Sequence, residues 1–469
     1  MSEKKFNFKI ILKAGVIGVL LLLMLIPLSF VKGVVKERSN YKNDAFKTIS
    51  GSWGKDQLIA APFLNVPYSY IYQEKDKDGK VKDVKRYGIY KISPSKLEAD
   101  VNIIPQIRYI GIFKLPVYTA EVTLKGAFGK MDDTEGRTVD LSKTQMTIEV
   151  ADLKGVAKLP EGSFNNRKLD FAPYTGSNAV LFSSALGNDE DYKDIAVLTK
   201  TEDSMRGHYK EYGSYGNRPG NQLKAIGSAV NYSNTSSDFE VKFALRGSNT
   251  INFVPAAKEN KFIVKSSWKD PLFFNSFLPD SKTISSDGFS AEWNISYLAS
   301  GIAQMFESLD ITPSIFGVKL SMPVDNYRNG LRSVKYGILF LSLTFLACFV
   351  FEIAGKMPIH PFQYVLVGLA MAVFYLLLVS ISEFIPFGWS YMIASAAVVL
   401  MVGAYARYGV IKKQGTKYFW IPAGIIAVLY MYLYVLLQLQ DLSLLLGSLG
   451  LFLGLGAVMY TTRNINWYE

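Results

Sequence analysis

The pattern of hydrophobic and polar positions divides the chain into three stretches. Near the N-terminus, a charge-free run from Ala14 to Val31 follows four lysines. This run is long enough to cross the hydrocarbon core of a bilayer, which takes roughly 20 apolar residues. A cleaved signal peptide would have a shorter apolar region and a small-residue cleavage site, which Ser29-Phe30-Val31-Lys32 does not offer. We therefore expect an uncleaved anchor helix, with residues 1–35 forming a cytoplasmic tail and this anchor.

The C-terminal third is nearly free of charge and predicts five more membrane helices. One span begins near Tyr336, and two longer apolar runs follow, each with a single acid near its middle, Glu383 and Asp441. Each run has about twice the length of one span, and a carboxylate at the bilayer centre is costly, so each acid most simply marks the turn of a helical hairpin. Tyr391, Tyr418, Trp420 and Trp467 suit interfacial anchors. The expected bundle, 336–463, has spans near 336–354, 362–382, 386–406, 418–438 and 442–461, before a short tail at 464–469.

The middle stretch, 36–315, alternates apolar with polar residues at the period of two that is typical of strands. Its strand-like runs are rich in Val, Ile, Thr, Tyr and Phe and are bounded by Gly, Pro, Asn and Asp. Alternation of this kind implies one buried and one wet face, and the absence of regular helices between the strands favours an antiparallel, sandwich-like β domain. The clearest strands are Lys114–Leu124, Gln145–Val150, Phe239–Leu245 and Asn249–Val254. Residues 75–85 and 203–221 are expected to be exposed hairpins or loops, and 316–335 to be a juxtamembrane connection.

The short loops between the expected spans predict the orientation. With the N-terminus inside, Lys4, Lys5, Lys9, Lys13 and the basic residues of every other short inner loop lie in the cytoplasm, while the outer turns carry only acids. Basic residues flanking the β domain would lie outside, but long domains translocate largely regardless of charge. We expect a multi-pass protein of the bacterial inner membrane, with both termini cytoplasmic and the β domain periplasmic.

The net charge bears on the expected binding partners, and the cysteine content bears on disulfide bonds. The net charge of +11 points to an anionic surface, and the lipid bilayer is the nearer one, because no basic run interleaved with aromatics favours nucleic acid. The single cysteine, Cys348, falls inside an expected span, so the β domain holds no internal disulfide.

The sequence offers few candidates for chemistry. The β domain has one histidine, His208, and no motif typical of hydrolases, phosphate sites or dinucleotide sites. We therefore expect no cofactor, no metal and no catalytic residues, with an undetected envelope hydrolase as the enzymatic alternative.

Five polar residues near the membrane are candidate functional residues, because ionisable groups at membrane depth are often functional. Glu352 and His360 lie near the expected cytoplasmic face, and Glu383 lies at an outer turn. Each glutamate is either an interfacial anchor or a proton- or substrate-handling group. Arg328 and Arg332 share one helix face and contact either lipid phosphates and carboxylates of the outer domain or a substrate.

Several C-terminal motifs resemble those of the CreD family, inner-membrane proteins associated with bacterial cell-envelope integrity. The resemblance is carried by Gly288-Phe-Ser-Ala-Glu-Trp293, Phe316-Gly-Val318, Pro323-Val-Asp-Asn-Tyr327, Arg332-Ser-Val-Lys-Tyr336, Leu343-Thr-Phe345, Glu352, His360-Pro-Phe-Gln-Tyr364 and Ser380-Ile-Ser-Glu383. It implies a role in envelope stability and stress response, and it brings no catalytic residues, because the family has no settled biochemical activity.

Two functions follow as hypotheses. The first is a non-enzymatic envelope-integrity protein whose β domain binds an envelope protein or a cell-wall component, while the bundle anchors it. The alternative is a transporter or lipid-handling protein that uses the five-helix bundle, with a polar cavity lined by Glu352, Ser380, Ser382 and Glu383. The sequence does not indicate an oligomeric state.

Overall fold

The computed structural model describes most of the chain. The residues outside the description are 1–7, 76–80, 133, 135, 175–222, 308–310, 323–325, 356–358, 408–419, 440–441 and 464–469. The expected loop at 203–221, His208, Tyr418, Asp441 and Trp467 all fall among them. The chain forms two compact units: a helical unit of residues 1–44 and 324–469, and a β unit of residues 45–323.

The helical unit begins with two nearly continuous helices, α1 (Phe8–Leu23) and α2 (Leu25–Trp53), the second of which runs on into the β unit. The interruption at Met24 has a local cause. Pro27 has no N–H, and its ring clashes with the carbonyl four residues earlier, that of Leu23. The hydrogen bonds from Met24 N to Leu20 O (3.0 Å) and from Leu28 N to Met24 O (3.3 Å) carry the helix across the break.

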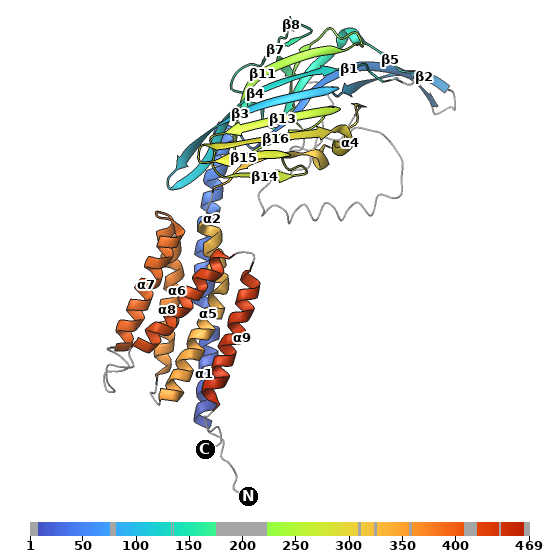
Figure 1. The fold of residues 1–469 in the computed structure, drawn as a ribbon. Coiled ribbons are helices and arrows are strands. Elements are labelled where there is room, and N and C mark those ends of the chain that lie inside the picture. The colour runs from blue at the N-terminus through green and yellow to red at the C-terminus, as the bar shows by residue number, and fades with distance from the viewer. Residues whose placement is uncertain are drawn as a thin grey trace. The chain divides into compact units, whose positions relative to one another are not determined.

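Five further helices complete the helical unit within the described residues (Figure 1). α1 packs against the first two of them, and each later helix packs against its predecessor in the chain. The helices are α5 (Asn326–Gly355), α6 (Pro361–Ser382), α7 (Phe387–Tyr405), α8 (Trp420–Gln438) and α9 (Ser443–Thr462).

The length and hydropathy of these helices suit a bilayer. In the described residues, four helical stretches are long and apolar enough to cross a membrane: Leu12–Trp53, Asn329–Ile353, Pro361–Ser382 and Phe387–Tyr405. Ala423–Gln438 and Leu445–Gly456 are shorter apolar helices. Six spans therefore stay a prediction, while an apolar N-terminal helix and several apolar C-terminal helices are confirmed.

The β unit consists of two mixed sheets, which confirms a large, mainly-β, sandwich-like domain. The larger sheet contains β1 (Gln57–Lys75), β2 (Val81–Ile92), β5 (Thr138–Val139), β6 (Gln145–Val150), β9 (Ala172–Tyr174), β10 (Lys224–Ala229), β12 (Thr250–Val254), β14 (Pro271–Asn275), β17 (Met305–Phe306) and β18 (Phe316–Leu320). The smaller sheet has the order β15 (Ser281–Ser285), β16 (Gly288–Ser296), β13 (Glu259–Ser266), β3 (Lys96–Ile110), β4 (Phe113–Phe128), β11 (Ser237–Ser248), β7 (Glu161–Phe164) and β8 (Arg167–Lys168). Single turns of helix are η1 (Leu141–Lys143), η2 (Leu153–Gly155), α4 (Tyr297–Ser300) and η4 (Thr312–Ser314).

The core of the β unit follows from the period-two alternation. Along β11, Phe239, Val241, Phe243 and Leu245 are buried, while the intervening residues are more exposed. The pairing is not wholly antiparallel, because β1 pairs with β12 and β13 pairs with β3 in parallel. Parallel neighbours need long crossover connections, so the strands that meet in these pairs are distant in the chain.

The β unit also extends further along the chain than the boundary at 315 expected from the sequence. Phe316–Leu320 forms β18, which lies between β12 and β14 in the larger sheet. Phe316 and Val318 are fully buried in the core. The unit therefore ends at Pro323, and α5 begins soon after it, at Asn326.

Candidate functional site

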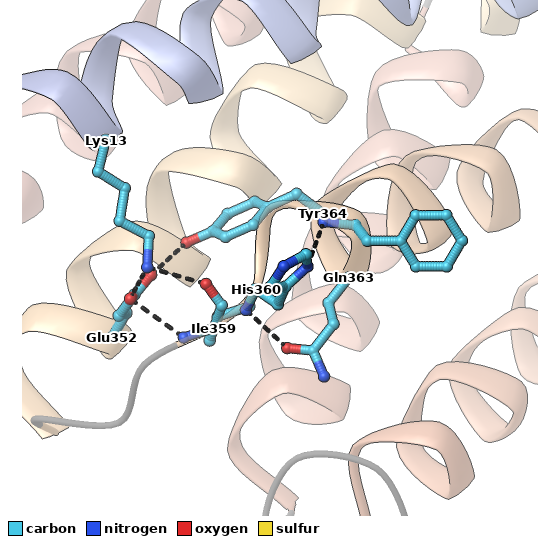
Figure 2. Close-up of polar contacts among 7 residues, drawn as sticks. Lys13, Glu352, Ile359, His360, Gln363 and Tyr364 are labelled. Carbon is cyan, nitrogen blue, oxygen red and sulfur yellow. Dashed lines mark hydrogen bonds and ion pairs between the residues drawn. The ribbon is translucent and has the colours of Figure 1, made fainter.

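A buried polar cluster lies where α5 ends and α6 begins, and its centre is Glu352 (Figure 2). The side chain of Glu352 is only 9% exposed. One carboxylate oxygen accepts hydrogen bonds from the Lys13 ammonium, in an ion pair, and from the backbone N–H of Ile359 (3.1 Å). The other accepts a hydrogen bond from the Tyr364 hydroxyl (3.1 Å). Both oxygens of this carboxylate therefore have hydrogen-bond partners.

Lys13 connects the N-terminal helix to this cluster. It comes from α1, and its ammonium also donates to the carbonyl of Ile359 (2.8 Å). Removing one member of a buried ion pair leaves the other charge uncompensated, which typically costs about 3–5 kcal/mol. The pair therefore attaches α1 to the connection between α5 and α6.

His360 lies beside the cluster and caps α6. Its Nδ1 accepts a hydrogen bond from the Phe362 N–H (3.2 Å), while the Gln363 side chain accepts one from the His360 N–H (3.0 Å). Together with Pro361 at the first helical position, this forms a capping box that satisfies N–H groups left free at the helix start. The structure thus brings Glu352 and His360 together, with His360 serving as the helix cap.

Glu383 lies at the opposite end of α6, where it is the C-cap residue. Its side chain is only 4% exposed and forms an ion pair of 3.0 Å with Arg38 from α2. α6 has 22 residues, so its ends lie about 33 Å apart at a rise of 1.5 Å per residue. Glu352 and Glu383 therefore cannot line one cavity, as the transport hypothesis required.

The two arginine candidates lie in the first turns of α5. Arg332 is half-buried, and no hydrogen bond or ion pair joins its side chain to another described residue. Arg328 belongs to the same helix, but its side chain lies outside the description. The role of both residues stays a prediction.

An apolar cavity lies next to the Glu352 cluster, among α5, α6, α7 and α8. It is lined mainly by hydrophobic side chains, and Tyr364 borders both the cavity and the cluster. The other lining residues are Cys348, Phe351, Ile359, Gln363, Val367, Val402, Tyr405, Ala406 and Ile425. Such a surface suits an acyl chain better than a polar solute.

The β unit contains a second buried ion pair, Lys91–Glu149, which the sequence did not single out. Both side chains are only 2% exposed, and the Lys91 ammonium also lies 5.4 Å from the centre of the Phe63 ring. The second oxygen of Glu149 has no hydrogen-bond partner among the described residues. Burial lowers the pKa of Lys91 to about 7, because a dry environment disfavours the charged form.

A cation–aromatic cluster lies on β1 and β2 of the larger sheet. The Arg137 guanidinium lies 4.7 Å from the ring of Tyr68, 5.3 Å from that of Tyr70 and 5.4 Å from that of Tyr90. Arg137 also forms an ion pair with Glu307, and the hydrogen bond in that pair raises the pKa of Arg137. The tyrosine cluster is therefore already occupied by a cation of the chain itself.

Metal or cofactor chemistry finds little support in the described parts of both units. No three His, Cys, Asp or Glu side chains gather there closely enough to hold a metal ion. The expectation of no cofactor stays a prediction.

Sequence reasoning missed three partners of the glutamates, namely Lys13, Tyr364 and Arg38. From the sequence, Lys13 is one of the basic residues expected on the cytoplasmic side, and Arg38 is one of the basic residues that flank the β domain. A signal was nevertheless available: a carboxylate near each end of a membrane helix favours a cation at the same depth, and the first span has cations near each of its ends.

Comparison with known proteins finds matches that cover nearly the whole chain. A protein family described as "Inner membrane protein CreD" matches residues 9–468. The curated protein "Inner membrane protein CreD" of Escherichia coli (strain K12) is 29% identical over 453 residues, which cover 95% of this chain and 91% of that protein. The match includes both the helical unit and the β unit.

Proposed function

We propose, since the chain belongs to the CreD family of inner membrane proteins, that it supports cell-envelope integrity without catalysing a reaction. In this proposal the β unit binds an envelope protein or a cell-wall component, and the helical unit anchors it in the bacterial inner membrane. Both termini lie in the cytoplasm and the β unit lies in the periplasm, as the distribution of basic residues in the short loops favours.

The observation that carries the proposal is that two acids of the helical unit form ion pairs with the N-terminal helices. Glu352 and Glu383, the acids most suited to transport, each form an ion pair with a cation of the N-terminal helices. The pairs join α1 to the end of α5 and α2 to the end of α6, and so hold the anchor to the bundle. Acids that are engaged in helix packing are poor candidates for carrying protons or substrates, which leaves the β unit as the functional part.

Exchanging the charges of the Lys13–Glu352 pair tests this structural role. Glu352→Lys alone places two cations together in a buried site, so we expect lower protein levels and loss of envelope-stress resistance in a deletion strain. Combining it with Lys13→Glu restores an ion pair in reversed polarity and should recover part of both, since the Ile359 N–H and the Tyr364 hydroxyl lose their carboxylate acceptor at position 352. The readouts are immunoblotting of membranes and survival under envelope stress.

A surface pair supplies the control for this exchange. Lys261 and Glu292 are 3.2 Å apart on the β unit, and their side chains are 43% and 35% exposed. Lys261→Glu should change neither readout, because ion pairs that solvent reaches contribute little. If the exchanged variant regains its normal level but not stress resistance, a carboxylate at position 352 has a chemical role. That outcome would reject the structural reading.

The second candidate function is lipid handling, and the apolar cavity beside Tyr364 favours it. A lipid-handling bundle that uses Glu352 as a polar contact would need the carboxylate on α5 itself. The charge exchange moves that carboxylate to α1, so lipid handling predicts failure of the exchanged variant where the envelope-integrity proposal predicts recovery.

A further inference from the structure

The hairpin formed by β3 and β4 continues beyond the core of the β unit (Figure 1). Buried and exposed residues alternate along β3 as far as Ile103. From Gln106 to Ile110 every residue is exposed, and the turn at Gly111 has a φ of 56°, a conformation that glycine adopts readily. From Gln106 to Ile112 the hairpin is therefore exposed, although the Arg108 guanidinium lies 4.5 Å from the centre of the Trp53 ring of α2. We name this end of the hairpin, residues 104–114, the β3–β4 tip.

The β3–β4 tip is apolar, although it is exposed. Its large exposed hydrophobic residues are Ile104 (41%), Ile107 (41%), Tyr109 (60%), Ile110 (38%) and Ile112 (38%). Its only charged residues are Arg108 and Lys114, and no acid occurs between Asp100 and Glu121. The Lys114 ammonium lies 5.8 Å from the centre of the Tyr109 ring. Isoleucines, a tyrosine and cations without acids are the combination that suits a phospholipid interface.

The other long hairpin of the β unit gives an internal comparison. The β1–β2 hairpin also exposes aromatic residues, Tyr72 (48%) and Tyr87 (76%). It carries acids among its cations, however, and Arg86 lies 3.9 Å from Glu74. Acids repel phosphate groups, so exposure of aromatic residues alone does not single out the β3–β4 tip. The absence of acids does.

The base of the β3–β4 hairpin packs on the last turns of α2. Ile49 is buried together with Leu115 and Val117, and Phe46 and Trp53 pack against them. The Trp53 indole N–H donates to the carbonyl of Tyr118 (3.2 Å). The base of the hairpin and the last turns of α2 therefore pack together within the β unit.

The chain that leads into these turns of α2 comes directly from a membrane-spanning run. Between Val31, where the first charge-free run ends, and Ala45, where the β unit begins, the helix adds only about 20 Å at 1.5 Å per residue. The connection between the apolar run and the β unit is therefore a short helical segment of the same chain.

From these observations we propose that the β3–β4 tip is a lipid-contacting element. Its isoleucines and Tyr109 enter the headgroup region of the phospholipid bilayer in which the protein is anchored, and Lys114 lies level with the phosphates. The inference depends on the exposed chemistry of the tip and not on the envelope function proposed above. It predicts that the tip meets lipid on whichever side of the membrane the β unit lies.

Site-directed spin labelling of the full chain tests the inference, and the single cysteine makes it practicable. In a Cys348→Ala background, a nitroxide is attached at Tyr109→Cys or Ile112→Cys, and the protein is reconstituted in vesicles of equal parts phosphatidylethanolamine and phosphatidylglycerol. Collision rates with oxygen, which concentrates in lipid, and with a water-soluble nickel chelate are measured. We expect an oxygen-to-nickel ratio several-fold higher at both tip positions than at the control positions.

Two control positions lie elsewhere on the β unit. Leu159 is 74% exposed, and Tyr87 is 76% exposed on the β1–β2 hairpin, so labels at Leu159→Cys and Tyr87→Cys should collide freely with the nickel chelate. Equal ratios at tip and control positions would show that the tip is in water. Protection of the tip from both reagents would show that protein covers it. Either result overturns the proposal.

Discussion

At the residue scale, three acids with buried side chains, Glu149, Glu352 and Glu383, each form an ion pair with a cation that is distant in the chain. Lys13–Glu352 and Arg38–Glu383 join helices, and Lys91–Glu149 joins strands β2 and β6. Charges are costly to bury unless they are compensated, so each pair identifies two segments that must meet in the folded protein. The pairs therefore indicate which segments of the chain pack together, and they do not by themselves indicate a chemical function.

Tyr391 shows how a residue's environment can differ from the one its type suggests. It was expected to be an interfacial anchor. Instead it is 3% exposed, and its hydroxyl donates to the carbonyl of Tyr430 (2.6 Å). A hydroxyl that finds a backbone acceptor can be buried at little cost, so the interfacial assignment of Tyr391 was wrong.

The Lys91–Glu149 pair gives a prediction at this scale. Glu149→Leu leaves the buried ammonium without a partner and should lower the free energy of unfolding by about 3–5 kcal/mol. Adding Lys91→Met removes the uncompensated charge, so the double variant should recover most of that loss. Urea unfolding of the detergent-solubilised protein, followed by β-sheet circular dichroism, measures both. Equal destabilisation of the single and double variants would contradict this account.

At the element scale, β18 joins β12 and β14 in the larger sheet. It pairs with β12 on one side and with β14 on the other. Gly317 lies at its centre, and a Cβ there would come within 2.4 Å of the Ile251 carbonyl oxygen and 2.9 Å of the Asn252 Cα. Glycine is required at this position by the close approach of β12, which explains its place between two buried residues, Phe316 and Val318.

Gly317→Ala is therefore expected to destabilise the protein, because the backbone of β12 must move to admit the methyl group. Overpacking of this kind typically costs about 1–3 kcal/mol. Gly129→Ala is the matched control, since its new Cβ would make only an ordinary contact of 3.6 Å with Ser95. Thermal unfolding should show a lower midpoint for the first variant and little change for the second; the reverse order would refute the steric explanation.

At the scale of the whole molecule, the chain combines a β unit assembled from a continuous segment with a helical unit assembled from both ends of the chain. The N-terminal helix packs against α5 and α6, so the helical unit is complete only after the β unit has been synthesised. Packing of the N-terminal helix against α5 and α6 must therefore follow synthesis of the β unit.

The proposed orientation can be tested with cysteine reporters in the Cys348→Ala background. Leu159→Cys lies on the β unit and should react with a membrane-impermeant maleimide once the outer membrane is permeabilised. Lys356→Cys, in the loop between α5 and α6, should react only after the inner membrane is disrupted, because positive loops stay in the cytoplasm. The opposite labelling pattern would reverse the proposed topology.

Local patterns in the sequence were sufficient to predict the fold class and the family. Apolar runs of bilayer length identify membrane helices, and alternation along stretches such as Phe239–Leu245 identifies strands with one buried face. Both signals depend only on neighbouring residues, so they can be read without coordinates. The motifs from Gly288 to Glu383 indicated the family for the same reason.

Only the tertiary structure decided which residues meet across the chain. Glu352 was a candidate from sequence, but its partner Lys13 is 339 positions away, and no local pattern specifies such a pair. The parallel pairing of β1 with β12, the place of β18 inside the sheet and the separation of Glu352 from Glu383 along α6 are of the same kind. Each depends on long-range packing, in which the burial of many side chains at once selects one arrangement.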